Sequence, residues 1–414
     1  MRAFTTPTLP PRDVRDADDL LEAIASAAAS RTRLDVQGLG SRKHLGRATD
    51  ADQVLSLVSL SGITTYEPDE LVLMAKAATP LSEILKALDD AGQMLAFDPQ
   101  LGAMTHEAAQ GTIGGVMATN LSGPRRMVAG AARDFLLGFN AVSGRGEAFQ
   151  SGSRVMKNVT GYDLSKLMAG SFGTLAVMHD VTIKTMPKPE DAASLLVAAP
   201  SIEQAGAAIR AALASSFEPT AGAIVPPKVA VFSDQKKLKE AAQNFPVAVI
   251  RVEGFAVSVK NRIDALSGLL KGHGEQMVLA KEESDLVQAE LRENTMIPPQ
   301  NNRVTWKISC PPAVGAPLLD DILKRPNCRA YADWAGGLIW VSHPSGGDSG
   351  AEALRKLVAP HGGHVTLINA PENIRMALDV FEPQPAPLHE LACRVKASFD
   401  PLGILNPGRM YDGI

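Results

Sequence analysis

The stretch GTIGGVMATN, residues 111–120, opens the most glycine-rich part of the chain. Thirteen of the 35 glycines fall between Gly102 and Gly173. Glycine is favoured where the backbone takes a positive φ or lies very close to a bulky group. Because this cluster interrupts apolar, non-repetitive sequence, it indicates backbone wrapped around a large flat ligand. The alternative is a series of tight turns between short strands.

The pattern around this stretch predicts alternating strands and helices. A short helix is expected over 112–120, where Gly114, Gly115 and Ala118 would let a neighbouring group approach the helix backbone closely. Apolar periodicity and turn residues predict the remaining elements of this half of the chain: helices over 16–30, 81–91 and 163–169, strands over 33–36, 71–77 and 175–185, and a hairpin of 135–142 with 147–150.

A second glycine-containing loop follows the strand at 33–36. Its residues Gly38-Leu39-Gly40-Ser41 offer backbone N–H groups and a hydroxyl, which suit a diphosphate. It is not a Rossmann loop, because the third glycine would have to occupy the position of Lys43. It is not a P-loop either, because it lacks Gly-Lys-Ser/Thr. A plain connection between two strands is the alternative.

The segment 186–191, Met-Pro-Lys-Pro-Glu-Asp, is the clearest linker in the chain. We therefore predict a first domain over 1–187, a second over 188–385, and a C-terminal helix and tail over 386–414 that return to the first domain. Strands near 195–199, 247–253, 303–309, 338–342 and 365–368 alternate with helices over 201–216 and 257–271. This pattern predicts an α+β domain with helices on one face of a mainly antiparallel sheet.

Composition excludes several functional classes. The 414 residues carry a formal net charge of −4 and no basic tract, so nucleic acid is not an expected partner. No 18-residue apolar run predicts a spanning helix, and the first residues lack a signal-peptide core. Cys310, Cys328 and Cys393 form no C-x-x-C pair, so neither an iron–sulfur cluster nor a zinc site is expected. Three scattered cysteines fit the cytoplasm.

Four segments together carry a family resemblance. They are the Gly38–Gly46 loop, GTIGG with Ala118-Thr119-Asn120, KNVTGYDL at 157–164 continuing to GSFGTL at 170–175, and the closing Asn-Pro-Gly-Arg at 406–409. In this order, the sequence resembles the FAD-binding domains of the vanillyl-alcohol oxidase and p-cresol methylhydroxylase (PCMH) type. The resemblance implies an α+β fold: a PCMH-type FAD-binding domain of two α/β subdomains, followed by an α+β cap domain with an antiparallel sheet.

Within this family the sequence is most similar to the FAD-binding E subunits of bacterial glycolate oxidases. The matching residues are LSGPRR at 121–126, RDFLLG at 133–138, VMKN at 155–158 and DWAGG at 333–337. The resemblance implies oxidation of glycolate, or a related 2-hydroxy acid such as D-lactate, beside a second flavin-binding subunit and an iron–sulfur subunit. It also implies a cytoplasmic protein, held at the inner face of the membrane only through its partners.

The resemblance further implies which residues would hold FAD. The loop Gly38-Leu39-Gly40-Ser41 would hold the diphosphate. Two further sets would surround the rest of the cofactor: Gly111, Thr112, Gly114, Gly115 and Thr119 along the isoalloxazine and ribityl chain, then Gly161, Asp163, Gly170, Gly173 and Val177 closing over it, with Pro99 ahead of this wall. Because Gly40 stands where many relatives carry a flavin-linked histidine, FAD should be non-covalent, and His44 is expected to be a surface or loop histidine.

Two departures from the family pattern affect this assignment. Ala176 replaces the last glycine of the usual Gly-Thr-Leu-Gly. Phe172 replaces a glutamate common in single-chain relatives, so no role of that carboxylate can be transferred.

The sequence offers no obvious general base for oxidation of a hydroxy acid. His106 is the best candidate, and Arg125 or Arg126 could hold a carboxylate because a guanidinium binds two oxygens at once. Contacts of these arginines with a partner or with the diphosphate are equally open. Three hypotheses therefore stand: a subunit of a glycolate oxidase complex, a free-standing dehydrogenase, and a non-catalytic subunit whose FAD relays electrons or supports assembly.

Overall fold

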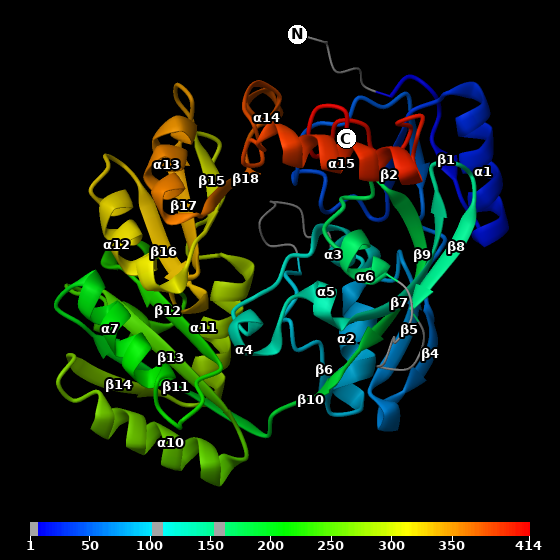
Figure 1. The fold of residues 1–414 in the computed structure, drawn as a ribbon. Coiled ribbons are helices and arrows are strands. Elements are labelled where there is room, and N and C mark those ends of the chain that lie inside the picture. Colours follow the sequence, from blue (N-terminus) through cyan, green and yellow to red (C-terminus); the bar gives the residue numbers. More distant parts are fainter. Residues whose placement is uncertain (1–6, 102–110, 153–161) are drawn as a thin grey trace. The chain divides into compact units, whose positions relative to one another are not determined.

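The structure is a computed structural model that describes residues 7–101, 111–152 and 162–414 (Figure 1). The chain divides into two compact units. Unit 1 comprises Met1–Leu121, Gly130–Lys188 and Glu372–Ile414, and unit 2 comprises Ser122–Ala129 and Pro189–Pro371. This division departs from the predicted domains at two places, because Ser122–Ala129 belongs to unit 2 and residues 372–385 belong to unit 1.

The first layer of unit 1 is a parallel sheet with strand order β1-β3-β2. Its strands are β1 (Arg12–Asp13), β2 (Leu34–Gln37) and β3 (Gln53–Ser56). Helix α1 (Ala17–Ser30) begins at Asp16, whose side chain accepts from the Asp19 N–H. Its buried face, with Leu20 and Ile24, packs in one apolar cluster with Leu34 of β2 and Leu55 of β3.

The second layer of unit 1 is a five-stranded antiparallel sheet with strand order β4-β5-β9-β7-β8. The predicted hairpin is confirmed as β7 pairing with β8, and the predicted strand over 175–185 as β9. The five strands are β4 (Ile63–Glu67), β5 (Val72–Lys76), β7 (Leu136–Ser143), β8 (Ala148–Gly152) and β9 (Ala176–Lys184). The predicted linker begins inside secondary structure, because β10 (Met186–Pro187) pairs with β6 (Gln93–Met94). The helices of unit 1 are α1, α2 (Leu81–Asp90), α3 (Ile113–Thr119), α5 (Ala132–Phe135), α6 (Leu164–Met168), α14 (Glu372–Ala377) and α15 (Ala386–Phe399).

A buried ion pair fixes the C-terminal helix to unit 1. The Lys396 ammonium on α15 donates to Asp400 Oδ2 at 2.7 Å and to the carbonyls of Thr174 and Leu405 at 2.6 and 2.9 Å. Asp400 in turn accepts from the N–H groups of Ile404 and Leu405. Leu405 then forms a parallel bridge with Leu34, so the tail continues the edge of the β1-β3-β2 sheet. Every donor position of this ammonium is therefore occupied by a buried acceptor.

Replacing Lys396 with Met should destabilise unit 1 strongly. The change leaves the Asp400 carboxylate buried without its cation, a situation that costs about 3 to 5 kcal/mol. The matched control is Lys86→Met, which removes a lysine paired with an aspartate at the same i,i+4 spacing but on the surface. Chemical denaturation should show a large loss for Lys396→Met and almost none for Lys86→Met; equal losses would contradict this account of the tail.

Unit 2 is built on one eight-stranded antiparallel sheet with strand order β14-β11-β13-β12-β16-β17-β15-β18. The strands predicted near 195–199, 247–253, 303–309, 338–342 and 365–368 are confirmed. All strands of this sheet are β11 (Asp191–Ala198), β12 (Ala221–Val225), β13 (Val247–Gly254), β14 (Glu275–Leu279), β15 (Arg303–Ser309), β16 (Arg329–Asp333), β17 (Leu338–Pro344) and β18 (His364–Asn369).

Helices cover both faces of this sheet, so the prediction of helices on one face is wrong. Ile209 of α7 (Ile202–Leu213) packs against Gly222, whereas Ser284 of α11 (Lys281–Glu293) bonds to Arg251 from the opposite face. Gly222 and Arg251 lie on opposite faces, because Gly222 pairs with Ile250, the neighbour of Arg251 in β13. The remaining helices of unit 2 are α4 (Arg126–Ala129), α8 (Pro227–Ala230), α9 (Lys236–Ala241), α10 (Ala256–Leu269), α12 (Pro312–Leu323) and α13 (Ala351–Val358).

Among the described helices, none combines the length and the apolar character that crossing a bilayer requires. No cluster of three or more metal-ligating side chains is found within the described ranges.

Candidate functional site

Two partly buried arginines bond to carbonyl groups of the loop after β2. The Arg409 guanidinium donates to the carbonyls of Arg42 and Lys43, at 3.1 and 3.4 Å. Arg375 donates to the carbonyls of Lys43 and Gly46, at 3.1 and 3.2 Å. Gly40 has φ +73°, a conformation that glycine adopts without strain. The loop is thereby held as a concave backbone turn, which is the geometry of an anion-binding nest.

Helix α3 packs its first turn directly on the backbone at the end of β5. The Gly114 N–H donates to the Ala77 carbonyl at 2.8 Å, and a Cβ at Gly114 would lie only 2.7 Å from that oxygen. Thr112 caps the helix by accepting from the Gly115 N–H at 3.2 Å. The predicted helix and the need for small residues in it are confirmed.

The turn before β9 lies against the other end of α3. The Gly170 and Phe172 N–H groups donate to the carbonyls of Met117 and Ala118. Phe172 and Gly173 both have positive φ, +55° and +69°. The Asn406 side chain then links this turn to β2: its amide donates to the Phe172 carbonyl and its oxygen accepts from the Val36 N–H, both at 2.7 Å. Three separate segments are thus held around one space.

Two adjoining hollows occupy this space in unit 1. Both are lined by Gly38, Thr112, Gly115, Ala118, Phe172 and Asn406, among other residues. Most of the residues predicted to surround a cofactor line one hollow or both: Gly38, Leu39, Gly40, Ser41, Thr112, Gly114, Gly115, Thr119, Gly173 and Val177. The structure therefore brings together three segments that are far apart in the sequence and were connected there only by the family resemblance.

Several predicted residues do not line these hollows. Gly111 lies beneath the Arg42 guanidinium, where a Cβ would come within 1.9 Å of Nη1. Asp163 caps α6 by accepting from the Lys166 N–H, and Gly170 packs on Asn120. Pro99 is buried but is not part of either lining. Gly161 and His106 lie outside the described residues.

Sequence reasoning missed the charged part of the lining. Arg42, Lys43 and Arg409 line the second hollow, with Asp35 as its acidic residue. In the sequence, the Asn406–Arg409 motif carries only the family resemblance and no charge assignment. Its position next to the loop could not be read from spacing, because Arg409 and Arg42 are 367 residues apart.

The second hollow carries more positive than negative side chains. Burial lowers the pKa of Arg409 to about 10, with Asp35 opposing the shift and Arg375 adding to it. Burial also lowers the pKa of Arg375. Because three cations and one carboxylate line the second hollow, an anion bound there would be stabilised.

His44 lies in the loop after β2, as one of the two predicted settings had it, but its ring lies among the same arginines and not at the surface. Both of its ring nitrogens are shielded from solvent. Burial, followed by the charges of Arg375, Arg42 and Arg409, lowers its pKa to about 4. At neutral pH His44 is therefore neutral and adds no further positive charge to the hollow.

This shift predicts an acid-sensitive fold. The pKa of His44 rises from about 4 in the folded chain to about 6.5 on unfolding. The unfolded state therefore binds more protons, so stability present above pH 6.5 falls as the pH is lowered toward 4, on the order of 3 kcal/mol in all. His44→Gln should flatten this pH dependence in denaturation measurements, with the exposed His361→Gln as its matched control. An unchanged slope in His44→Gln would contradict the assignment.

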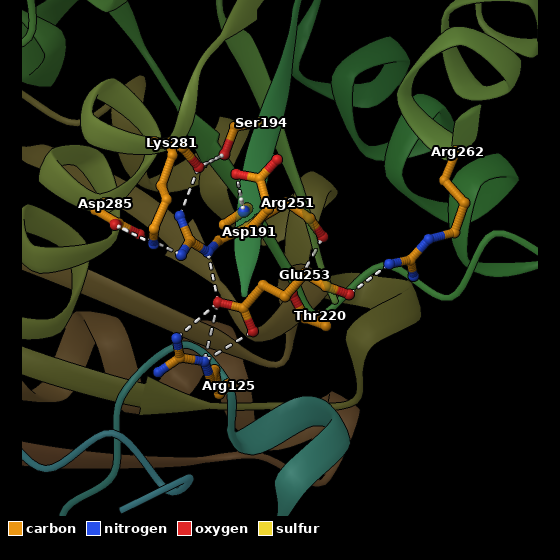
Figure 2. Close-up of polar contacts among 11 residues, drawn as sticks. Arg125, Asp191, Ser194, Thr220, Arg251, Glu253, Arg262, Lys281 and Asp285 are labelled. Atoms are coloured by element: carbon orange, nitrogen blue, oxygen red, sulfur yellow. Dashed lines mark hydrogen bonds and ion pairs between the residues drawn. The ribbon is translucent and has the colours of Figure 1, made fainter. Parts of the chain in front are cut away.

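Arg125 is engaged in a buried network of unit 2 and is not placed to hold a ligand carboxylate (Figure 2). Its guanidinium donates to both oxygens of Glu253, at 2.6 and 2.9 Å. Arg251 donates to the same Glu253 at 2.8 Å and also to Ser284 and Asp285. Burial acts to raise the pKa of Glu253, but Arg125 and Arg251 outweigh it and leave that pKa below its usual value. Arg125 thus fixes the segment Ser122–Ala129 to β13.

The two departures from the family pattern both lie in the lining. Ala176 lines the first hollow and is nearly fully buried, so its methyl group occupies space that glycine would leave open. Phe172 lines both hollows and its ring packs against Phe381. An aromatic ring therefore stands in the wall where many relatives place a carboxylate.

Comparison with known proteins agrees with this arrangement. Residues 13–152 match the family model described as an FAD binding domain. The glycolate oxidase subunit GlcE of Escherichia coli is 32% identical over 95% of this chain and 96% of its own length. The chain belongs to the GlcE family. It is an FAD-binding oxidoreductase, and its cofactor is FAD.

Other relatives and structures are more distant. The glycolate oxidase subunit GlcD of Bacillus subtilis is 24% identical over 62% of this chain and 54% of its own length. A D-lactate dehydrogenase of Archaeoglobus fulgidus is 39% identical over 29% of this chain and 27% of its own length. The solved structure of p-cresol methylhydroxylase with substrate bound superposes with a TM-score of 0.69 at 13% identity, covering 97% of this chain and 89% of that one. This superposition shows the fold, which is the predicted PCMH type.

The hollows fit FAD on physical grounds. Their walls carry glycine at Gly38, Gly114, Gly115 and Gly173, so backbone is open to a flat ring system. The neighbouring basic lining meets the need of a diphosphate for cations and N–H donors.

Proposed function

We propose that this chain is the FAD-binding subunit of a complex that oxidises glycolate, and related 2-hydroxy acids such as D-lactate, to the 2-oxo acid. The observation that carries the proposal is the similarity to GlcE along almost the full length of both chains. Matches to GlcD and to D-lactate dehydrogenases support the wider substrate class. Electrons would pass from the flavin to a partner iron–sulfur subunit, with a second flavin-binding subunit in the same assembly.

We propose distinct tasks for the residues around FAD. Backbone N–H groups of Gly38–Ser41, together with Arg42 and Arg409, would hold the diphosphate. Thr112, Gly114 and Gly115 on α3 would lie along the ring system and ribityl chain, opposite Gly173 and Val177. Asp163 and Gly170 would not contact FAD directly. Asp163 would hold α6 in place, and Gly170 would hold the turn before β9. Gly161 is also proposed to contact FAD, on the basis of the sequence alone.

FAD is proposed to bind without a covalent link. Gly40 provides no side chain for a bond to the flavin. His44 is not part of either lining, and its ring is enclosed among arginines.

Bound FAD supplies the hydride acceptor for oxidation of the acid. The chain's own residues must then orient the acid and hold the proton of its hydroxyl group. Among the residues that the structure describes, the linings of the two hollows contain no histidine and no glutamate, and Asp35 is their one acidic side chain. His106 remains a candidate general base for the hydroxyl proton, and only the sequence supports it.

This lining favours one alternative function, in which the FAD of this chain relays electrons or supports assembly while a partner binds the acid first. A free-standing dehydrogenase is less well supported, because it would need a base from this chain alone.

An anaerobic absorption experiment tests the proposal. The purified chain should show a flavin spectrum, and the flavin should be reduced by glycolate when the partner subunits are present. Reduction of the isolated chain by glycolate or D-lactate would favour catalysis by this subunit itself. Failure of the complete complex to reduce its flavin with any 2-hydroxy acid would contradict the proposed function.

Replacing Gly115 with Leu should abolish retention of FAD. A side chain at this position would extend into the hollow, since the nearest neighbour of its Cβ is Thr112 Oγ1 at 3.3 Å. Gly272→Leu is the matched control, because no atom lies within 4 Å of a Cβ at that exposed turn. The ratio of flavin to protein absorbance should fall at least tenfold for Gly115→Leu and stay unchanged for Gly272→Leu. Full occupancy in a folded Gly115→Leu protein would place FAD elsewhere.

A further inference from the structure

Helix α15 of unit 1, drawn in red in Figure 1, carries apolar side chains on its exposed face. Leu388 and Leu391 are 49% and 48% exposed, and Val395 is only half-buried. These three positions recur at i, i+3 and i+7, so they form one stripe along the helix. Of the 14 residues of α15, all of which the structure describes, only Lys396 is buried.

The side of α15 that packs on unit 1 is polar. Lys396 lies there, and its ammonium bonds to Asp400 and to two backbone carbonyls. His389 and Cys393 precede Lys396 at helical spacing on the same side, with His389 Nε2 3.5 Å from Cys393 Sγ. A surface helix normally buries its apolar stripe and exposes its polar side. The reversed arrangement in α15 is typical of a surface that another protein covers.

A chain of packed rings joins α15 to the wall of the flavin hollows. The ring of Phe172, which lines both hollows, has its centroid 5.3 Å from that of Phe381. The centroid of Phe381 lies 5.6 Å from that of Tyr411, which lies 6.4 Å from the imidazole of His389 on α15. These separations are within the range of about 4.5 to 7 Å for packed aromatic pairs. Two packed rings, those of Phe381 and Tyr411, therefore lie between the hollow wall and a side chain of α15.

The proposed oxidation produces electrons that must leave the flavin site. Conversion of one 2-hydroxy acid to its 2-oxo acid releases two electrons and two protons; the protons pass to water, and the electrons pass to the acceptor. An iron–sulfur cluster takes up one electron at a time, so two cluster reductions are needed for each acid oxidised. Electron tunnelling slows steeply with distance and is faster through packed atoms than across water-filled gaps. The acceptor is therefore expected to dock where a short, packed path reaches the surface, and the rings need not take up the electrons themselves.

We propose that the stripe formed by Leu388, Leu391 and Val395 on α15 is the docking surface for the electron-accepting iron–sulfur subunit. The proposal rests on the proposed function, which supplies both the electrons and the acceptor. Glu390 and Arg394 are exposed on the same helix and give the apolar stripe the polar rim that is typical of protein interfaces.

Photo-crosslinking in the assembled, FAD-loaded complex tests which subunit covers the stripe. Leu391 is replaced with the photoreactive amino acid p-benzoylphenylalanine, and the linked peptides are identified by mass spectrometry. A link to the iron–sulfur subunit is expected. A link to the second flavin-binding subunit, a link to another copy of this chain, or no link overturns the proposal.

Leu269 of α10 in unit 2 provides the matched control for the cross-link. It is a helical leucine with 47% exposure, almost the same as that of Leu391. The photoreactive residue at this position should give no link to the iron–sulfur subunit. An equal yield of that link from both positions would also overturn the proposal, because the contact would then not be specific to α15.

The affinity of this chain for the rest of the complex provides a second readout. Leu391→Glu and Leu391→Lys should each weaken it about tenfold or more, because either charge would be buried in an apolar interface. Leu391→Met keeps an apolar side chain of similar volume and should stay within about threefold of the wild-type affinity. Leu269→Glu should leave the affinity unchanged. All four variants should retain FAD at the wild-type ratio of flavin to protein absorbance, which separates docking from folding; an FAD-loaded Leu391→Glu that binds normally overturns the proposal.

Flavin reduction by glycolate in the complete complex reports separately on the proposed function. If the flavin is reduced but position 391 gives no link to the iron–sulfur subunit, only the docking surface is overturned. If that link forms but no 2-hydroxy acid reduces the flavin, the proposed function is overturned and the docking surface stands.

Discussion

The carboxamide of Asn406 is the interaction on which the flavin-binding part of unit 1 depends. It accepts from the Val36 N–H on β2 and donates to the Phe172 carbonyl in the turn before β9, each at 2.7 Å. Both partners are backbone groups of segments that do not pair with each other in a sheet. Because Asn406 is itself buried, loss of either bond would leave a polar group unsatisfied. The two walls of the hollow are therefore held at a fixed separation by one side chain.

The same C-terminal segment also supplies charged side chains next to the hollows. The tail is fixed first by Lys396 and Asp400, and it then brings Asn406 to the walls and Arg409 to the loop after β2. Arg409 donates to the carbonyls of Arg42 and Lys43 and so helps to fix the loop that lines the second hollow. Unit 2 uses buried charge differently. There, Glu253 is shared between Arg125 and Arg251 and fixes the segment Ser122–Ala129 to β13.

Local sequence predicted the elements that depend on local rules. The short helix over 112–120, its small residues Gly114 and Gly115, and five of the eight strands of the unit 2 sheet were readable from residue type and periodicity. Contacts between distant segments were not readable. Glu253 lies 128 residues from Arg125, so adjacency of Arg125 and Arg126 could not show that one is an anchor and the other lies on Trp334. The helix α11 was missed as a cover for the second sheet face for the same reason: its buried bond to Arg251 is a tertiary contact.

The most direct measurement of this account is the dissociation constant of FAD in the Asn406→Asp variant. Aspartate keeps the shape and still accepts from the Val36 N–H, but it sets a carboxylate oxygen against the Phe172 carbonyl where the amide donated. A loss of about 1 to 3 kcal/mol is expected, which raises the dissociation constant roughly 5- to 150-fold while the exposed Asn302→Asp control binds FAD normally. If Asn406→Asp binds FAD as tightly as the wild-type protein, the hollow beside Asn406 is not the flavin site.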